Sequence, residues 1–567
     1  MNDKRWVFQT MPESTEVATL ANAIGVDSSI AALLVQKGIT DFDQAKNYFR
    51  PSLEDLHDPF LMKDMDKAVQ RLWQSIQNQE EILIYGDYDV DGVTSVSLVY
   101  GFLKQYCDKL RFYIPDRYKE GYGVSKQAIN WAIEIGISLI ITLDCGIKAT
   151  ECIQQAQIAG IDVIVCDHHE PGEALPPAYA ILDPKQKACL YPFKELSGCA
   201  VGFKLLQAFV LQQNISLDIL YQYLDLVAIS IACDLVPLTG ENRILAYHGL
   251  KRLNNSPSFG IQAIIQVANL PWTLGISQLV FGLGPRLNAA GRVDHGSLAV
   301  KLLLAEDSVT ASSLARQIEE KNGFRRYLDS TITAEALQLM KASDESLIAK
   351  TTVLFKEDWH KGVIGIVASR CIEHYYRPTI ILTASGDKAT GSARSVAGYN
   401  IYEAITSCSE LLEQYGGHAH AAGLTLPLEN IISFQERFEQ VVSNTISQEL
   451  LIPVQKIDLL LPLEKVTNKF YNILNQMAPF GNGNMRPVFA TELVIATKYR
   501  ILKENHLKLT VQEPASSICI DAIGFGLAKY AHLVCDRKPF KIAYTIERNN
   551  YQGQVNLQLN IKGLQPI

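Results

Sequence analysis

Three aspartates stand at alternate positions directly after an apolar run in the segment "ILIYGDYDVDG". They are Asp87, Asp89 and Asp91. Three carboxylates this close together repel one another and need a compensating cation. A calcium-binding loop shows similar spacing, but it needs a flanking helix and a Glu six residues after its glycine, where this chain has Leu98. We therefore predict a metal site here; the alternative is a solvated acidic turn.

More acidic side chains, together with two histidines, follow other apolar runs. The segment "ITLDCG" ends its run at Asp144, "VIVCDHHE" carries Asp167, His168 and His169, and the helical "IACDLVP" reaches Asp234. A lone aspartate after a strand is more often a helix N-cap than a metal ligand. Four such stretches favour a shared site, because parallel strands bring their carboxyl ends to one edge of a sheet.

The residue types narrow the chemistry of such a site. Carboxylates and imidazoles suit Mn²⁺ or Mg²⁺ better than the metals that prefer thiolates. A carboxylate that bridges two such ions is the arrangement of two-metal hydrolysis, which generates hydroxide and stabilises the leaving oxygen. The pattern therefore indicates cleavage of a phosphoester or a phosphoanhydride.

The elements that would position these groups alternate between strand and helix. Strands are expected at 82–85, 110–114, 139–143, 163–166 and 178–182, with helices at 93–106, 125–135 and 149–159. This alternation implies a parallel sheet. Residues 196–253 have a helical pattern, and 309–341 is expected to be one long helix that connects two lobes.

A second α/β region and a β-rich region complete the chain. The second region should contain strands at 352–355 and 379–382 and helices at 364–373 and from Ile401. Short strands are then expected at 457–461, 488–496, 507–511, 518–524, 540–546 and 555–561. Several short strands separated by turn residues favour a small barrel, with the OB-fold as the candidate.

The fold class is therefore α/β, with a parallel-sheet domain joined by a long helix to a smaller α/β domain and followed by a C-terminal OB-fold β-barrel. The expected segments are an N-terminal helical segment at 1–75, the catalytic domain at 76–305, the connecting helix at 306–345, the second α/β domain at 346–450 and the barrel at 451–567.

Composition and charge limit the classes of function. Of the 567 residues, 48% are hydrophobic and 20% charged, which is typical of a folded protein. No apolar run is long enough to span a membrane, the N-terminus lacks a secretory signal, and the eleven cysteines form no Cys-x-x-Cys pair, so a cytoplasmic location is expected. The net charge is −8, but residues 451–567 carry 14 Lys and Arg against 8 Asp and Glu. A net of +6 in this segment favours a polyanionic partner.

The motifs "GDYDVDG", "LDCG", "CDHHE" and "CDLVP" resemble those of the DHH phosphoesterase superfamily. The further motifs "GPRLNAAGR", "GSARS" and "YGGHAHAAG" resemble those of its bacterial branch of single-strand-specific 5′→3′ exodeoxyribonucleases. The resemblance covers the chain past about residue 75, in the order DHH domain, long helix, DHHA1 domain and OB-fold.

This resemblance implies the ligands of two metal ions. One ion would be held by Asp91, Asp144, His168 and Asp234; the other by Asp89 and Asp144 with help from Asp87, so that Asp144 forms the bridge. Many relatives have a histidine where this chain has Tyr85, which leaves the ligand set of the second ion open.

The resemblance also implies roles for the groups beside the metal ligands. His169 would face the scissile phosphate, and Asp167 would orient a histidine from behind. Arg117 and Tyr122, just past the second strand, would offer a cation and a stacking face to the DNA.

Other candidate contacts to the strand lie further along the chain. "GPRLNAAGR" supplies Arg286, Asn288 and Arg292, and "GSARS" supplies Ser392 and Arg394 for a terminal 5′-phosphate. In "YGGHAHAAG", Gly416 and Gly417 precede a stretch typical of a helix start, whose amides would bind a phosphate beside His418. Each of these groups could instead be structural.

The sequence thus predicts an exonuclease that uses two Mn²⁺ or Mg²⁺ ions to degrade single-stranded DNA from the 5′ end to 5′-mononucleotides, in recombination and DNA repair. One alternative is a DHH phosphohydrolase of short oligonucleotides or cyclic dinucleotides; the other is a non-catalytic single-strand-binding scaffold. The resemblance implies a monomer with no membrane partner, and a single-strand-binding protein and a RecQ-type helicase as partners.

Overall fold

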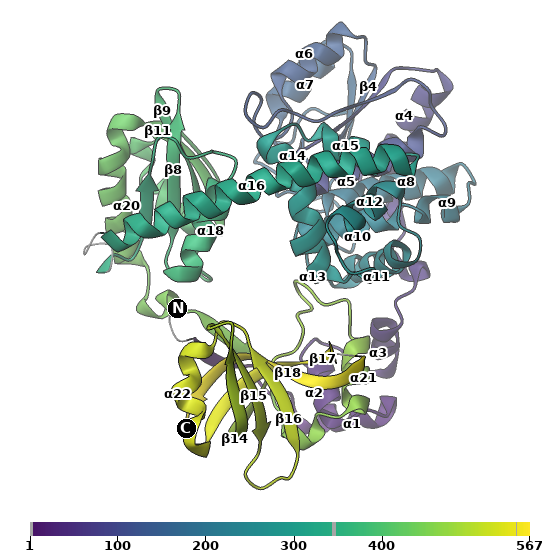
Figure 1. Cartoon of the computed structure of the whole chain (residues 1–567). Coiled ribbons are helices and arrows are strands. Elements are labelled where there is room, and N and C mark those ends of the chain that lie inside the picture. Colours follow the sequence, from purple (N-terminus) through teal and green to yellow (C-terminus); the bar gives the residue numbers. More distant parts are fainter. Residues whose placement is uncertain (1–3, 343–347, 552) are drawn as a thin grey trace. The chain divides into compact units, whose positions relative to one another are not determined.

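The computed structural model describes residues 4–342, 348–551 and 553–567 (Figure 1). The chain forms two compact units. Unit 2 comprises Arg50–Arg325 and Ala478–Met485, and unit 1 comprises the chain up to Phe49, Arg326–Met477 and Arg486–Ile567. Each unit is described by itself below.

Unit 2 is built on the parallel sheet that the sequence predicts. Its strands are β2 (Ile82–Gly86), β3 (Leu110–Tyr113), β4 (Leu139–Leu143), β5 (Asp162–Cys166) and β6 (Ala180–Leu182). They lie in the order β3-β2-β4-β5-β6, and every pairing is parallel. The strand order reverses between β2 and β4, and such a reversal places the ligand site of an open α/β sheet at the carboxyl ends of the strands.

Helices cover both faces of this sheet. On one face Ile82 and Ile84 pack with α5 (Val90–Leu103), α8 (Gly198–Gln212) and α10 (Leu224–Cys233). On the other face the alternate residues Leu83 and Tyr85 pack with α6 (Lys126–Glu134) and α7 (Thr150–Ile158). Because successive strand residues point to opposite faces, strands covered on both sides are apolar throughout.

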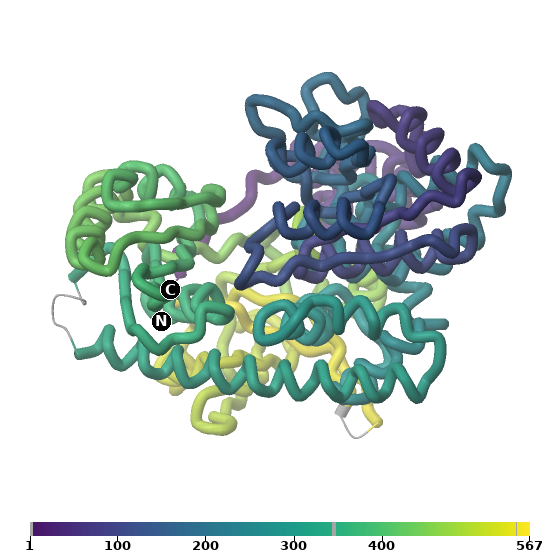
Figure 2. Tube along the Cα trace, turned by 90° about the horizontal axis from the view of Figure 1, so that it is seen from above, coloured from purple at the N-terminus to yellow at the C-terminus, as the bar shows by residue number. Residues whose placement is uncertain are grey.

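The remainder of unit 2 is helical. Its other main helices are α4 (Met65–Gln77), α11 (Gly240–Asn255), α12 (Phe259–Val267), α14 (Gly284–Val293) and α15 (Ser297–Leu303). The predicted long helix is confirmed as α16 (Ser308–Ala342), which begins in unit 2 and ends in unit 1. Figure 2 shows it as one continuous teal helix.

Unit 1 contains a five-stranded mixed sheet in the order β10-β11-β9-β8-β7. The strands are β7 (Thr352–Phe355), β8 (Thr379–Ser385), β9 (Lys388–Arg394), β10 (Gln414–His418) and β11 (Ala421–Pro427). Helices α16 and α18 (Ile364–His374) pack on one face, and α19 (Ile401–Thr406) and α20 (Ile431–Thr445) on the other.

The prediction that a helix begins after Gly416 and Gly417 is wrong. Both glycines lie in β10, where Gly417 pairs with Ala422 of β11. Gly417 has a φ of 149°, and a Cβ there would lie 2.4 Å from the carbonyl oxygen of Ala421. The glycines therefore allow a tight antiparallel hairpin, and no helix N-terminus is present to bind a phosphate.

The C-terminal strands form the predicted barrel. They are β14 (Phe489–Leu502), β15 (His506–Gln512), β16 (Cys519–Gly524), β17 (Phe540–Tyr551) and β18 (Gln554–Pro566). The order is β14-β15-β16-β18-β17, and pairing between β14 and β17 closes the barrel. Five strands closed in this way are typical of an OB-fold.

The N-terminal segment begins with a strand that the sequence pattern did not indicate. β1 (Arg5–Phe8) pairs in parallel with β12 (Val454–Ile457), just before the barrel. The expected helices follow as α1 (Ser14–Ile24), α2 (Ser28–Val35) and α3 (Phe42–Phe49).

Among the described residues, no single helix has the length and apolar character needed to cross a membrane; the bent pair α1 and α2 meets that test only when the two are taken together.

Candidate metal centre

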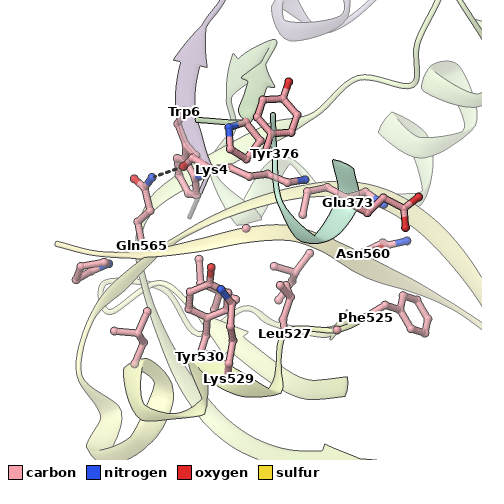
Figure 3. A pocket seen from close by; sticks show the side chains of 18 of the residues that line it. Lys4, Trp6, Glu373, Tyr376, Phe525, Leu527, Lys529, Tyr530, Asn560 and Gln565 are labelled. Atoms are coloured by element: carbon pink, nitrogen blue, oxygen red, sulfur yellow. Dashed lines mark hydrogen bonds between the residues drawn. The ribbon is translucent and has the colours of Figure 1, made fainter. Parts of the chain in front are cut away.

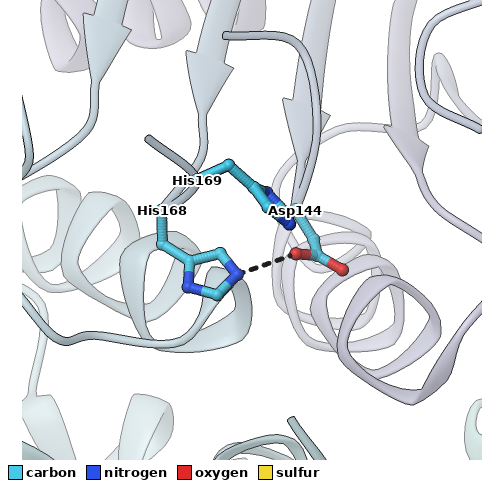
Figure 4. Close-up of side chains that lie close together, drawn as sticks. All are labelled: Asp144, His168 and His169. Atoms are coloured by element: carbon cyan, nitrogen blue, oxygen red, sulfur yellow. Dashed lines mark ion pairs between the residues drawn. The ribbon is translucent and has the colours of Figure 1, made fainter. Parts of the chain in front are cut away.

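The carboxyl ends of the strands in unit 2 bring the predicted ligands together. His168, which follows β5, has its Nε2 3.2 Å from Asp144 Oδ1, which follows β4 (Figure 4). The same nitrogen lies 3.7 Å from Asp91 Oδ2 and 3.6 Å from Asp234 Oδ2. Asp91, His168 and Asp234 offer ligand atoms within 4.8 Å of one another, and so do Asp144, His168 and His169, so that His168 is shared by two groups that could each hold a metal ion.

A second feature typical of a metal site is that polar groups are buried here without hydrogen bonds. Both carboxylate oxygens of Asp87 and Nε2 of His168 are buried and form no hydrogen bond among the described residues. Burial, reinforced by neighbouring carboxylates, raises the pKa of Asp87, Asp144 and Asp234 well above its usual range. A divalent cation would relieve this repulsion and supply the missing partners, so the oxygen and imidazole donors fit Mn²⁺ or Mg²⁺.

Asp91 is held by the start of α8. It lies in the first turn of α5, and its carboxylate accepts hydrogen bonds from the backbone N–H groups of Gly198 (2.7 Å) and Cys199 (2.8 Å). The Ser230 hydroxyl of α10 donates a third hydrogen bond at 2.7 Å. These donors satisfy a buried carboxylate and fix its direction.

Asp144 has an unusual backbone conformation. Its φ is 59°, in the left-handed region, and its N–H donates to the carbonyl oxygen of Cys166 at 2.9 Å. A Cβ on Gly198 would lie only 2.6 Å from the Cβ of Asp144. The glycine therefore lets the N-terminus of α8 approach the central carboxylate of the cluster.

Asp167 and His169 form a hydrogen-bonded pair, and a ring nitrogen of His169 also lies within 4.8 Å of ligand atoms of Asp144 and His168. The carboxylate of Asp167 accepts from His169 Nδ1 at 2.7 Å and from the N–H of Ile147 at 3.0 Å. Burial opposes ionisation of Asp167, yet these donors lower its pKa to about 2. Burial also lowers the pKa of His169, but the contact with Asp167 outweighs it and leaves that pKa raised. The ring is thereby oriented with Nε2 facing away from Asp167, 3.1 Å from the hydroxyl of Tyr122.

The remaining carboxylate of the first motif and Tyr85 have distinct roles. Asp89 caps α5 and accepts from the N–H of Gly92 at 3.1 Å. Tyr85 points to the face of the sheet that α6 and α7 cover. Its hydroxyl donates to the carbonyl oxygen of Gly123 at 2.7 Å, and its ring stacks on Tyr113. Tyr85 therefore does not take the place, as a ligand, of the histidine that many proteins with similar motifs carry at this position. The assignment of Asp87 and Asp89 to the second ion stays a prediction.

The candidate DNA contacts of unit 2 lie in different surroundings. The guanidinium of Arg117 lies 4.8 Å from the ring centre of Tyr88, and its charge acts on Asp87. Arg286 forms an ion pair with Glu319 of α16 at 2.6 Å, so part of its guanidinium is already bound within the protein. Arg292 accepts a hydrogen bond from the Tyr118 hydroxyl through its carbonyl oxygen. The roles of Arg117, Arg286, Asn288 and Arg292 stay predictions.

The residues predicted to bind the terminal 5′-phosphate lie in unit 1. Ser392 and Arg394 lie on β9, and Arg394 Nη1 donates to the Ser392 hydroxyl at 3.1 Å. A Cβ on Gly365, near the start of α18, would lie 2.8 Å from both side chains. Gly417 and His418 lie on β10, one strand beyond β11, which pairs with β9. These residues gather at one end of the sheet, and their role in binding stays a prediction.

Sequence reasoning missed the end of the fifth strand. In "AILDPKQ", Asp183 follows β6 in the same way as Asp167 follows β5. Its side chain is fully buried with Oδ2 unpaired among the described residues, and burial raises its pKa to about 7. The signal was present, since this strand also ends in aspartate.

Unit 1 contains a large cavity (Figure 3). The residues that line it are distant in sequence from the predicted metal ligands. Its volume is about 950 Å³, and it borders β1, β18 and the segment 525–533 of the barrel domain. The walls combine aromatic and cationic side chains, including Trp6, Tyr376, Tyr530, Lys4 and Lys529. Among the described residues that line the cavity, Glu373 is the one acidic side chain, so this lining differs from the acidic cluster of unit 2.

Family models match most of the chain. The DHH family N-terminal domain matches residues 81–231, the DHHA1 domain matches 345–444, and the RecJ OB domain matches 457–563.

Known proteins give the same result. The chain is 38% identical over 563 residues to the single-stranded-DNA-specific exonuclease RecJ of Bacillus subtilis, covering 98% of this chain and 70% of that protein. It is 33% identical to the RecJ of Escherichia coli, covering 89% of this chain and 91% of that one. The crystal structure of RecJ in complex with Mn²⁺ from Thermus thermophilus is similar with a TM-score of 0.86 at 26% identity, covering 99% of this chain and 80% of that chain. A second crystal structure, of the same protein with Mg²⁺, is similar with a TM-score of 0.79. With three matched domains and with curated relatives that are 33–38% identical over most of its length, this chain belongs to the RecJ family of DHH phosphoesterases.

Proposed function

We propose that this protein is a divalent-metal-dependent exonuclease that degrades single-stranded DNA from the 5′ end to 5′-mononucleotides, in recombination and DNA repair. The observation that carries the proposal is the cluster of Asp91, Asp144, His168 and Asp234, in a chain whose curated relatives are named single-stranded-DNA-specific exonucleases.

The reaction consumes one water for each nucleotide released. The water oxygen bonds to phosphorus, the bond from phosphorus to O3′ of the terminal nucleotide breaks, and O3′ takes up a proton. The products are a 5′-mononucleotide and a strand that is one nucleotide shorter with a new 5′-phosphate. Bound Mn²⁺ or Mg²⁺ would lower the pKa of the water and stabilise charge on the leaving oxygen.

Each residue of the centre has a role in the proposal. Asp91, Asp144, His168 and Asp234 would hold one ion, and Asp87, Asp89 and Asp144 the other. His169, whose Nδ1 is fixed by Asp167, would direct Nε2 toward an oxygen of the scissile phosphate. The partly exposed Tyr122 beside it would contact the same end of the strand.

Recognition of the polymer would extend beyond the metal centre. Ser392 and Arg394, with Gly417 and His418, would bind the terminal 5′-phosphate through a hydroxyl and a guanidinium. Arg117, Arg286, Asn288 and Arg292 would contact the backbone near the site. The barrel, with its net charge of +6 over 451–567, would hold the strand further along by phosphate contacts and stacking.

Two other functions are less well supported. A phosphohydrolase of short oligonucleotides or cyclic dinucleotides has no need for a basic barrel. A non-catalytic scaffold has no need for His168 Nε2 and the Asp87 carboxylate to be buried without a hydrogen bond among the described residues.

The proposal is tested by cleavage of a 3′-labelled single-stranded oligonucleotide in Mn²⁺ or Mg²⁺. Parallel substrates carry a 5′-phosphate, a blocked 5′ end or a complementary strand. We expect shortening from the 5′ end of the single strand only, abolished in Asp144→Ala. Cleavage restricted to dinucleotides or cyclic dinucleotides would favour the small-substrate alternative, and metal and DNA binding without cleavage would favour the scaffold.

The assembly of the protein is part of the proposal. A monomer would give the mass of one 63.0 kDa chain in light scattering after gel filtration. A single-strand-binding protein and a RecQ-type helicase are proposed partners. Each would be tested by a binding titration, and failure to bind would remove that partner and leave the nuclease proposal intact.

A further inference from the structure

The turn after β6 places a lysine beside the metal centre. β5 and β6 are parallel with Cys166 opposite Leu182, and the N–H of Asp167 donates to the carbonyl oxygen of Leu182 at 3.0 Å. Asp183 is therefore the neighbour of Asp167 along the edge of the sheet. The chain then continues through Pro184 to Lys185, which forms an ion pair with Glu170, the residue that follows the two histidines.

Buried hydrogen bonds hold this turn in place. The carboxylate of Asp183 accepts from the N–H of Lys185 at 2.8 Å. The amide of Gln186, itself buried, donates to the carbonyl oxygens of Ile181 (2.8 Å) and Asp183 (3.2 Å). The backbone of Lys185 is thus anchored on both sides, and a fixed backbone limits where its ammonium group can reach.

The side chain of Lys185 lies along the protein, with only 20% of it exposed. Its Nζ is 3.7 Å from Glu170, which directly follows His169 and has 78% of its side chain exposed. Lys185 is therefore a cation whose backbone is bound by Asp183 and whose ammonium group lies beside the residue that follows His169.

A cation at this position works against the binding of metal ions, because like charges repel. The ion pair with the exposed Glu170 at 3.7 Å does not by itself explain a lysine at position 185, since ion pairs of this kind contribute little to stability. An anionic group that arrives with the substrate would explain it better. In the proposed reaction that group is a phosphate of the DNA strand.

We propose that Lys185 is a further catalytic residue, whose ammonium group donates a hydrogen bond to a non-bridging oxygen of the scissile phosphate or its neighbour. Glu170 holds the ammonium group until the DNA arrives, and the phosphate then replaces this carboxylate. This inference rests on the proposed nuclease function. The inference adds a substrate contact from the turn after β6 to the side chains that the ends of β2, β4, β5 and α10 contribute to the centre.

The test measures two quantities for Lys185→Met, which keeps much of the length of the side chain and removes its charge. The first is kcat/KM for cleavage of the 5′-phosphorylated single strand, expected to fall about 100-fold, because the loss of one donor to transition-state charge has an effect of at least this order. The second is the dissociation constant for Mn²⁺ by titration calorimetry, expected to stay equal or become tighter because a repelling cation is gone.

Two further variants complete the test. Lys185→Arg keeps the charge and should recover a large part of the activity. Lys187→Met removes an exposed lysine of the same turn and should cleave as the wild type does. A structural role for Lys185 would instead lower the melting temperature and weaken Mn²⁺ binding in Lys185→Met.

The outcomes separate the two proposals. A wild-type protein that cleaves, beside a Lys185→Met variant that cleaves equally well or binds Mn²⁺ more weakly, overturns this inference alone. A wild-type protein that leaves single-stranded DNA intact overturns the nuclease proposal and this inference with it.

Discussion

Individual side chains at the metal centre divide into those that would bind metal and those that direct their neighbours. Asp167 belongs to the second group, because both of its oxygens are occupied by the backbone and by His169. Its contact with His169 selects the tautomer in which Nδ1 carries the proton. A change at Asp167 should therefore affect catalysis more than the binding of metal.

Asp167→Asn is expected to lower kcat about 10- to 100-fold, the usual effect of losing a group that orients a functional histidine. The asparagine has the same shape, but its neutral oxygen is a weaker acceptor for Nδ1–H. The Mn²⁺ dissociation constant, measured by calorimetry, should change little. Loss of Mn²⁺ binding in this variant would contradict the assignment and make Asp167 part of the ligand set.

Asp183 should make the stability of unit 2 depend on pH. Burial raises its pKa to about 7 in the folded protein, against 3.8 as the reference for an exposed aspartate. A raised pKa means that the folded state favours the protonated form. The stability from this group is present below pH 3.8 and is lost as the pH rises toward 7 and above.

Asp183→Asn removes this titration and keeps an oxygen that can accept from the N–H of Lys185. We expect the variant and the wild type to be equally stable near pH 4. By pH 8 the variant should gain about 1–3 kcal/mol in free energy of unfolding. Denaturant unfolding at several pH values would check this, and a constant difference across the range would contradict it.

Among the secondary-structure elements, the start of α8 contributes most to the geometry of the site. Its first two N–H groups bind Asp91, and Gly198 lies against Asp144. An added methyl group at position 198 would lie 2.6 Å from the Cβ of Asp144, which is shorter than any normal contact. The helix and the carboxylate cannot both keep their positions if Gly198 is replaced.

Gly198→Ala is therefore expected to weaken Mn²⁺ binding at least about 10-fold and to lower the melting temperature, because overpacking of this kind costs about 1–3 kcal/mol. Helix propensity alone would predict the opposite, since alanine favours a helix over glycine. The matched control is Gly323→Ala in α16, where a Cβ meets no atom within 4 Å. It should be slightly more stable than the wild type, and equal behaviour of the two variants would contradict the packing argument.

Across the whole molecule, charge is divided between an acidic catalytic region and a basic barrel. On the barrel, Arg500 of β14 and Lys508 of β15 are direct cross-strand partners, so their side chains lie on the same face. Like charges directly opposite each other destabilise a sheet. Their presence together is typical of a surface that binds a polyanion.

Arg500→Gln combined with Lys508→Gln should weaken binding of a long single strand. It should also reduce the slope of log K against log salt by about 1.4, since each phosphate contact on a single strand contributes about 0.7. The melting temperature should not fall, because a repulsion is removed. The control replaces two exposed lysines of unit 2, Lys251 of α11 and Lys301 of α15, by glutamine. An equal change of slope in both double variants would show an effect of net charge alone.

Much of the fold follows from patterns within short segments. The five apolar runs of unit 2 became buried parallel strands, and the long helix and the barrel strands lie where periodicity placed them. The hairpin at Gly416 and Gly417 was not predicted, because a run of glycines and alanines has no hydrophobic period that distinguishes a strand from a helix. Strand β1 was missed for another reason: its partner β12 lies more than 400 residues away.

The sequence by itself determined which residues could bind metal, because an apolar strand that ends in aspartate or histidine is visible in a single segment. It also determined the charge of the barrel. The tertiary structure decided which of these groups meet. The order β3-β2-β4-β5-β6 brings together the ends of β2, β4, β5 and β6, each of which is followed by an aspartate. The N–H groups of α8 and the hydroxyl of Ser230, which bind Asp91, come from more than 100 residues further along the chain. Spacing along a chain reports local periodicity, whereas a site depends on packing between elements, and only the folded molecule contains that information.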